Sequence, residues 1–252
     1  MNTNIMNPKA AAWDSVGGLF WKEGRQNAKP SDKMINKFLE GILAGQSCLI
    51  IGASTKSLIE EALSRNIKIT VIDFSKKMCE DLAQEIGVKN VNILVHDALT
   101  HPPSLLKNNQ QFIISDRLVN RFSQSETSIF FNNIKHYLCE HAELRTTIKM
   151  GLYEIDNALI EEGKSRGTVK NFYNEKEGWI DFSLAADELT TSVTPHGTIS
   201  RDILINWYQK RAREARFNPL DIQQILLRNN FKIFNEELID LTTNTYFYKA
   251  KI

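Results

Sequence analysis

The stretch LIIGASTKSL, residues 49–58, has the pattern of a buried strand that ends in a tight turn and leads into a helix. Nucleotide-binding α/β proteins carry a glycine-rich loop at such a turn, because glycine lets the backbone approach the ligand closely. Only Gly52 is present here, and Ser54 and Lys56 stand two and four residues after it. The stretch therefore predicts an α/β fold and leaves open whether its turn binds a nucleotide.

Short apolar segments recur on both sides of this stretch, with helical patterns between them. A continuous apolar run is typical of a strand that is buried on both faces of a parallel sheet. Near the C-terminus, Asn218 and Pro219 open a further helix, and a turn between two last strands favours antiparallel pairing. We predict an α/β fold with a Rossmann-like, seven-stranded, mostly parallel sheet, helices on both faces and a C-terminal antiparallel strand. The expected strands are 47–51, 68–73, 91–95, 111–115, 144–150, 231–240 and 243–252, and the expected helices before the fifth strand include 32–44, 56–65, 76–86 and 125–139.

Two acidic residues follow neighbouring strands of this predicted sheet. Ligands of open α/β sheets bind at the carboxyl ends of the strands. Asp73 ends the strand after the Gly52 turn, where a carboxylate can accept hydrogen bonds from both hydroxyls of a ribose. Asp97 ends the next strand, within reach of an adenine amino group. Either residue alone could cap a turn, but both in register with Gly52 favour a ligand that contains adenosine.

Residues 48–116 resemble the core of the class I S-adenosylmethionine-dependent methyltransferases. The matching segments are CLIIGAS (48–54), VIDFS (71–75), VHDALT (95–100) and FIISD (112–116). The resemblance implies S-adenosylmethionine as the cofactor, with the ribose held by Asp73. It further implies that Gly52, Ala53 and Ser54 face the methionine part and that Asp97 and Ala98 lie by the adenine. Phe74 and Met78 are candidates to flank the adenine, and either could belong to the core instead.

The loop departs from the family pattern at three positions. The family commonly has an acid where Ile50 stands, a second glycine at Ser54 and often a third at Lys56. This cofactor has no pyrophosphate that must approach the backbone, so fewer glycines are required than in a dinucleotide fold. We therefore interpret the turn as a degenerate S-adenosylmethionine loop rather than as an NAD loop.

The missing acid at Ile50 leaves the methionine ammonium group without its usual partner. Ser115 and Asp116, at the end of the fourth strand, are candidates to hold the methionine part. Arg25, in an aromatic N-terminal segment, could clamp the methionine carboxylate through two hydrogen bonds, or it could be a surface residue.

Residues 152–217 form a long connection between the fifth strand and the helix at Asn218. Connections of this length inside a compact domain are usually functional, and many are lids. We expect three parts. Residues 1–151 form an N-terminal cofactor-covering arm and the S-adenosylmethionine-binding half of the core, residues 152–217 form a helical lid over the substrate, and residues 218–252 complete the core sheet.

The predicted lid offers candidates for the chemistry. Aromatic faces attract a sulfonium cation, and Tyr153, Phe172, Tyr173 and Trp179 lie in or beside the lid. His196, in the segment TPHG, is the candidate general base, with a solvated loop histidine as the alternative.

Three activities agree with these features. The first is methyl transfer to a small-molecule acceptor enclosed under the lid. The second is cyclisation of the aminocarboxypropyl group of S-adenosylmethionine to azetidine-2-carboxylate with release of methylthioadenosine, because the chain weakly resembles azetidine-2-carboxylate synthases of this fold. The third is a non-catalytic module that binds the cofactor. In the cyclisation, the candidates to orient the amine and steady the sulfonium are Asn120, Tyr153, Tyr173 and Ser200.

The amino-acid composition limits the classes of binding partner that we expect for the protein. The chain has 252 residues and a formal net charge of +1, which gives no bulk attraction to nucleic acid or to an anionic membrane. The basic run KRAREAR (210–216) is interrupted by Glu214, so we predict a solvated helix face. No signal sequence or apolar span is evident, and no cysteine–histidine cluster has metal-ligand spacing, so we expect a cytoplasmic protein without a metal. Cys48, Cys79 and Cys139 are expected to be free thiols, and the sequence does not indicate the oligomeric state.

Overall fold

The computed structural model describes residues 8–23, 29–87 and 91–252, and its centre is a seven-stranded sheet with the strand order β3-β2-β1-β4-β5-β10-β9. Strand β10 runs antiparallel to both of its neighbours, β5 and β9, whereas the other neighbouring strands are parallel. The predicted fold class is therefore confirmed. The strands are β1 (Ser47–Ile51), β2 (Lys68–Asp73), β3 (Val91–Val95), β4 (Gln110–Asp116), β5 (Leu138–Lys149), β9 (Lys232–Asp240) and β10 (Thr245–Lys251).

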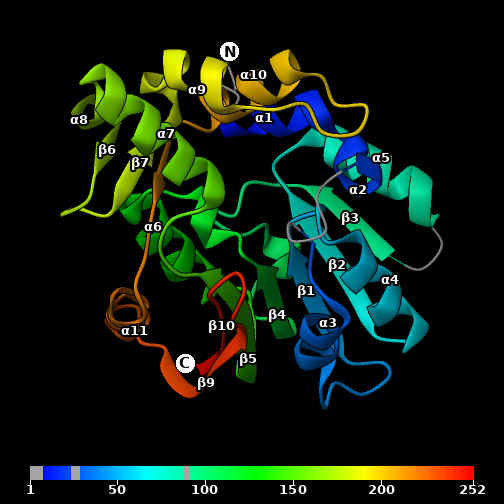
Figure 1. The fold of residues 1–252 in the computed structure, drawn as a ribbon. Helices are drawn as coiled ribbons and strands as arrows, with labels where there is room; N and C mark the ends of the chain where they lie inside the picture. Colours follow the sequence, from blue (N-terminus) through cyan, green and yellow to red (C-terminus); the bar gives the residue numbers. More distant parts are fainter. Residues whose placement is uncertain (1–7, 24–28, 88–90) are drawn as a thin grey trace, which may run out of the picture.

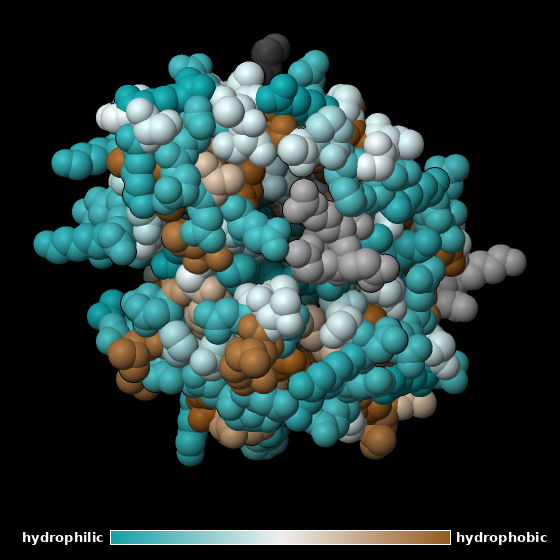
Figure 2. Space-filling model, viewed as in Figure 1, coloured by the Kyte–Doolittle hydropathy of each residue, from teal (hydrophilic) through white to brown (hydrophobic). Residues whose placement is uncertain are grey.

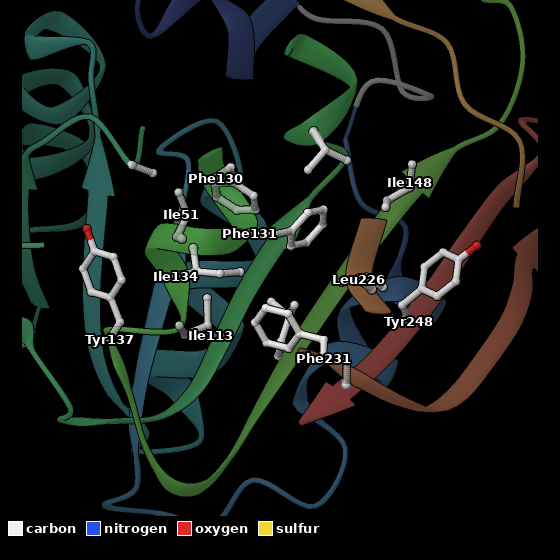
Figure 3. Packing of buried hydrophobic residues seen from close by; sticks show 14 of the residues in the cluster. Ile51, Ile113, Phe130, Phe131, Ile134, Tyr137, Ile148, Leu226, Phe231 and Tyr248 are labelled. Atoms are coloured by element: carbon white, nitrogen blue, oxygen red, sulfur yellow. The ribbon is translucent and has the colours of Figure 1, made fainter. Parts of the chain in front are cut away.

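Helices cover both faces of this sheet (Figure 1). Alternate residues of β1 serve the two faces: Leu49 and Ile51 pack in one apolar layer, and Cys48 and Ile50 pack in the other. Side chains of a strand alternate between faces, so a run without polar residues is what a sheet covered twice requires. Figure 3 shows part of the first layer, where Phe131 of α6 lies among the labelled apolar side chains. The first layer contains α6 (Gln124–Ile134) and α11 (Pro219–Arg228), and the second contains α3 (Asp32–Leu39), α4 (Lys56–Ser64) and α5 (Lys76–Ile86).

Two predicted helix starts are confirmed in detail. The Ser31 side chain accepts a hydrogen bond from Met34 N, which caps α3. Asn218 caps α11 in the same way, with Pro219 at the first helical position.

Some predicted boundaries are wrong. Helix α3 ends at Leu39 rather than near residue 44, and α6 ends at Ile134 rather than at residue 139. Tyr137 N and Leu138 N bond to the carbonyls of Ile134 and Lys135, so the helix tightens into a turn. Strand β5 then begins at Leu138, which pairs with Gln110 of β4. Pairing with β4 overrides the apolar periodicity that continued the helix in the sequence pattern.

Residues 152–217 form a separate substructure with its own apolar core, which includes Leu159, Phe172 and Leu189. We predicted a helical insertion, and the structure adds a three-stranded antiparallel sheet in the order β6-β7-β8. The aromatic, turn-rich segment KNFYNEKEGWIDF contains the first two of these strands. The elements of this substructure are α7 (Glu154–Arg166), α8 (Val169–Phe172), β6 (Tyr173–Asn174), β7 (Trp179–Asp181), a 3-10 turn at Phe182–Leu184, α9 (Ala186–Ser192), α10 (Arg201–Arg211) and β8 (Arg213–Ala215). The core has two further 3-10 turns, at Ser104–Leu106 and Val119–Arg121.

The N-terminal helices α1 (Pro8–Val16) and α2 (Leu19–Glu23) lie at the same end of the molecule as the lid helices (Figure 1). Helix α1 packs along α10, where the rings of Trp13 and Trp207 meet edge to face at 5.4 Å between centroids. On the face seen in Figure 2, apolar residues form small separate groups in a mostly hydrophilic surface. No helix in the described ranges is long and apolar enough to cross a membrane.

Candidate functional site

A cavity of about 680 Å³ lies between the carboxyl ends of the central strands and the layer formed by α1 and the lid. The core contributes Gly52, Asp73 and Asp116 to its wall. The N-terminal arm contributes Trp13 and Phe20. The lid contributes Tyr153, His196, Trp207, Tyr208 and Arg211.

A second, small cavity of about 20 Å³ adjoins the first. Asp97, Ala98 and His96 line it, and Gly52, Asp73 and Phe74 border both cavities. Sequence segments that are far apart thus meet at one end of the sheet. The arrangement brings together most of the predicted cofactor-binding residues: Gly52, Ser54, Asp73, Phe74, Asp97, Ala98 and Asp116.

The turn after β1 needs only one glycine. Gly52 has a φ of +111°, a conformation that strains other residues, whereas Ser54 and Lys56 are not among the residues with positive φ. Thr55 Oγ1 donates to Gly52 O at 2.9 Å and closes the turn. Lys56 opens α4 and pairs with the surface carboxylate of Glu85 at 3.2 Å, so its bulk stays out of the loop. The missing glycines therefore do not distort this turn.

Asp73 joins the end of β2 to that turn. Its Oδ2 accepts from Ala53 N at 2.8 Å and its Oδ1 accepts from Ser75 N at 2.7 Å. Burial raises the pKa of Asp73 to about 6, against the opposing effect of these two N–H donors. A carboxylate has about four acceptor positions, so two are left for further donors such as a pair of hydroxyls.

Asp116 lies on the other side of the cavity beside Arg117. The Arg117 guanidinium donates to both Asp116 oxygens, at 3.2 Å and 3.0 Å, and Thr147 Oγ1 also bonds to the carboxylate. Arg117 has a φ of +49°, which turns the chain at the end of β4. The predicted acid is therefore one half of a charge pair that lines the cavity.

Several predicted residues have structural contacts away from the cavity. Met78 and Ala53 are fully buried in the core, and Ser115 donates to Thr146 Oγ1 at 2.8 Å. Asn120 bonds to both backbone groups of Lys149, at 2.8 Å and 3.0 Å. Neither cavity is lined by Tyr173 in β6, nor by Ser200, whose side chain caps α10. Arg25 lies outside the described residues.

The prediction for the basic run KRAREAR was wrong. Helix α10 ends at Arg211, and Arg211, Glu214 and Arg216 are buried. Arg211 donates two hydrogen bonds of 2.7 Å to Glu214, and Arg216 pairs with both Glu214 (3.1 Å) and Asp156 (2.5 Å). Arg121 completes the network at 3.2 Å from Glu214. The local charge pattern predicted a solvated face because it does not include Asp156 and Arg121, the buried partners, which are distant in the sequence.

Three neighbouring arginines determine the ionisation state of the Glu214 carboxyl. Burial alone would raise the pKa of this carboxyl, but the guanidinium groups of Arg211, Arg121 and Arg216 outweigh burial and hold the pKa well below its usual range. Glu214 is therefore an anion that binds three arginines to one another between the lid and the core.

Tyr153, a predicted catalytic residue, lies against this network. Its ring centroid is 5.0 Å from the Arg121 guanidinium, 4.9 Å from that of Arg216 and 4.8 Å from Lys149 Nζ. Its hydroxyl is buried and has no hydrogen-bond partner within the described ranges, and the same holds for Trp207 Nε1 and His96 Nε2. Buried polar atoms without partners are rare in folded proteins, and one explanation for them is a ligand or a water molecule.

The N-terminal arm is attached to the site by polar contacts. Lys9 Nζ pairs with Glu126 at 2.6 Å, and Trp21 Nε1 donates to Ala53 O in the turn after β1 at 3.1 Å. Ser75 Oγ donates to Asp14 at 2.6 Å. Sequence reasoning named the arm as a cover but could not identify these anchors, because each one joins residues far apart in the chain.

Comparison with solved structures identifies the fold. A Rhodobacter sphaeroides protein, named provisionally as a Zn-dependent alcohol dehydrogenase, is 35% identical with a TM-score of 0.93, and the match covers 98% of this chain and 99% of that one. A Leishmania major S-adenosylmethionine-dependent methyltransferase is 10% identical with a TM-score of 0.59, over 96% and 81% of the two chains. The magnesium protoporphyrin IX methyltransferase of Synechocystis, solved with S-adenosylhomocysteine, is 14% identical with a TM-score of 0.53, over 87% and 80%. No protein-family model matches the sequence, and no curated protein is significantly similar to it.

The zinc ion in the name of the Rhodobacter protein does not fit the residues found here. Zinc sites in proteins use three or four histidine, cysteine or carboxylate ligands. Across residues 8–23, 29–87 and 91–252, no three such side chains are grouped as a metal ion would require. The three cysteines are free thiols, as predicted.

Proposed function

Because the chain belongs to the family of the Rhodobacter sphaeroides protein and has the class I S-adenosylmethionine-dependent methyltransferase fold, we propose that it is a methyltransferase that acts on a small molecule enclosed under its lid. One observation carries this proposal. Asp73 stands where the two cavities adjoin, with two N–H bonds formed and acceptor positions left. That is the arrangement expected of a carboxylate that holds a ribose.

The residues present fit the cofactor. Asp73 would accept hydrogen bonds from the two ribose hydroxyls, and Asp97, Phe74 and His96, whose Nε2 has no partner among the described residues, would lie near the adenine. Gly52 and Ser54 would face the methionine part, beside the Asp116–Arg117 pair. When bound, S-adenosylmethionine supplies an electrophilic methyl group carried on a sulfonium.

The chain's own residues position an acceptor and exclude water. Sites for small molecules typically have volumes of about 300–1,000 Å³, and the main cavity falls within this range. Aromatic side chains from the arm and the lid, among them Trp13 and Trp207, cover the cavity. His196 also lines it and is the candidate base for an acceptor that must lose a proton.

The cyclisation alternative has less support. It assigned the orientation of the amine to Asn120, Tyr153, Tyr173 and Ser200, and only Tyr153 of these lines the cavity. A non-catalytic module would not need the cover that the lid and the arm form over the cavity.

Two measurements test the proposal. Titration calorimetry should detect binding of S-adenosylhomocysteine to the wild-type protein and its loss in Asp73→Ala. The protein is then incubated with S-adenosylmethionine alone, and the products are followed by mass spectrometry. We expect intact S-adenosylmethionine, because the acceptor is missing. If the products are stoichiometric methylthioadenosine and a new amino acid, the activity is cyclisation and not methyl transfer. If the wild-type protein does not bind S-adenosylhomocysteine, the cofactor assignment is refuted.

A further inference from the structure

Positive charge exceeds negative charge around Tyr153, on and directly behind the wall of the main cavity where β5 meets the lid. Arg121, Lys149 and Arg216 surround the Tyr153 ring at no more than 5.0 Å, and Arg211 joins them through Glu214. The carboxylates paired with these four cations are Glu214 and Asp156. Glu154, which also lines the cavity, acts on Lys149 through its charge, but Glu154 is exposed and water weakens its effect. With Glu154 counted, four cations against three carboxylates leave a formal excess of one positive charge.

Lys149 is the cation of this group without a carboxylate partner within the described part of the chain. Its Nζ donates to the carbonyls of Leu152 at 2.6 Å and Met150 at 3.2 Å. An ammonium group has three donors, so one remains. Lys149 is half-buried, and burial lowers its pKa. The charges of Asp156 and Glu154 also act on Lys149, but its hydrogen bonds go to carbonyl groups. A half-buried cation of this kind is stabilised when an anion approaches it.

Two polar groups of the same wall also lack partners in the described ranges: the Tyr153 hydroxyl and Trp207 Nε1. Lys149, Arg121, Tyr153 and Trp207 all line the main cavity. Around them the wall is apolar, with Trp13, Phe20, Phe122 and Tyr208. A carboxylate can accept from several of these donors at once, and an aromatic or aliphatic body suits the apolar surface.

We propose that this wall binds the carboxylate of the acceptor, so that the substrate is a small carboxylic acid with an apolar or aromatic body. This proposal rests on the proposed function, because it describes the acceptor side of the same cavity. Lys149 and Arg121 would hold the anion, with Tyr153 as a hydroxyl donor.

The methionine carboxylate of the cofactor offers the same chemistry, but the strand order favours the acceptor. Lys149 ends β5 and Asp73 ends β2, with β1 and β4 between them. Three interstrand spacings amount to roughly 14 Å. A cofactor with its ribose at Asp73 would therefore leave the Lys149 wall to the second substrate.

The test measures binding of benzoate and of its neutral analogue benzamide to protein saturated with S-adenosylhomocysteine, by calorimetry. Wild type should bind benzoate at least about tenfold more tightly than benzamide, because charge-assisted hydrogen bonds are roughly twice as strong as neutral ones. Lys149→Met should remove this preference, Lys149→Arg should keep most of it, and Tyr153→Phe should weaken benzoate binding alone. Lys76→Met, which removes an exposed lysine on α5, is the matched control and should behave as wild type.

Three results would overturn the proposal. The first is equal binding of benzoate and benzamide, or no binding of either. The second is a Lys149→Met variant that unfolds at the wild-type temperature and still prefers benzoate. The third is a Lys149→Met variant that binds S-adenosylmethionine at least about tenfold more weakly but binds methylthioadenosine, which lacks the carboxylate, as wild type does. That last result would assign the wall to the cofactor. Failure of the wild-type protein to bind S-adenosylhomocysteine would instead refute the proposed function.

Discussion

The carboxylate of Asp73 accepts a 2.8 Å hydrogen bond from the backbone N–H of Ala53, and this bond ties the end of β2 to the turn that follows β1. The proposed ribose ligand is thus also a structural part of the loop that would face the methionine group. Binding and loop geometry are coupled through one side chain, which determines how variants of Asp73 behave.

Asp73→Asn should weaken binding of S-adenosylhomocysteine at least about tenfold, because an amide offers fewer acceptors and adds a donor. The amide oxygen can still accept from one of the two N–H groups. Asp73→Ala leaves both Ala53 N and Ser75 N unpaired, so it should also reduce the free energy of unfolding by about 1–3 kcal/mol. Calorimetry and urea unfolding measure the two effects. An Asp73→Asn variant with wild-type affinity would contradict the ribose assignment.

Binding should also depend on pH through Asp73. Its pKa is about 6 in the folded protein, and hydroxyl donors prefer the charged carboxylate. Affinity for S-adenosylhomocysteine should therefore fall as the pH drops below about 6, by up to about tenfold per pH unit. The Asp73→Asn variant is the control and should lack this dependence. A wild-type affinity that stays constant from pH 7 to pH 5 would contradict the assignment.

Stability should respond to the same group in the opposite direction. The folded pKa of Asp73, about 6, lies above the ordinary value of 3.8 for an aspartate side chain, so folding favours the protonated form. Its contribution to stability is fully present below about pH 4 and is lost as the pH rises through about 6. The free energy of unfolding of wild type relative to Asp73→Asn should increase from pH 7 to pH 4. Urea unfolding of both proteins at several pH values measures this difference. A difference that does not change with pH would contradict a raised pKa of Asp73 in the folded protein.

The buried ion network should be sensitive to the loss of its anion. Glu214→Gln removes the carboxylate that pairs with Arg121 and Arg211 and leaves Arg216 with Asp156, so we expect a loss of about 3–5 kcal/mol in the free energy of unfolding. Urea unfolding measures this loss. The control is Glu175→Gln at an exposed site, which should change stability by less than about 0.5 kcal/mol. Equal stability of the two variants would show that the network does not hold the lid to the core.

The arm should support the loop through Trp21. Trp21→Phe removes the indole N–H that donates to Ala53 O, so the free energy of unfolding should fall by about 0.5–1.5 kcal/mol and S-adenosylhomocysteine should bind several-fold more weakly. The matched control is Trp179→Phe, which removes an indole N–H bonded to the Glu177 side chain at an exposed position. Both unfolding temperature and calorimetric affinity are measured. Identical affinities of the two variants for S-adenosylhomocysteine would show that the contact of Trp21 with the loop does not contribute to cofactor binding.

Local sequence determined the core of the fold. Apolar runs fixed the central strands because each strand is buried on both faces, and the caps at Ser31 and Asn218 fixed two helix starts because capping involves neighbouring residues. The Gly52, Asp73 and Asp97 spacing indicated one edge of the sheet, since parallel strands present their carboxyl ends together.

Only the tertiary structure decided the acceptor side of the cavity. The run 210–216 looked like a solvated helix, yet its charges are buried because Asp156 and Arg121, far away in sequence, supply partners. The sequence indicated that Asn120, Tyr173 and Ser200 were available for chemistry. In the structure Asn120 bonds to the backbone of Lys149, Tyr173 lies in β6 away from the cavities, and Ser200 caps α10. Pairing between distant charges depends on how the lid closes on the core, and a local sequence pattern contains no information about that distance.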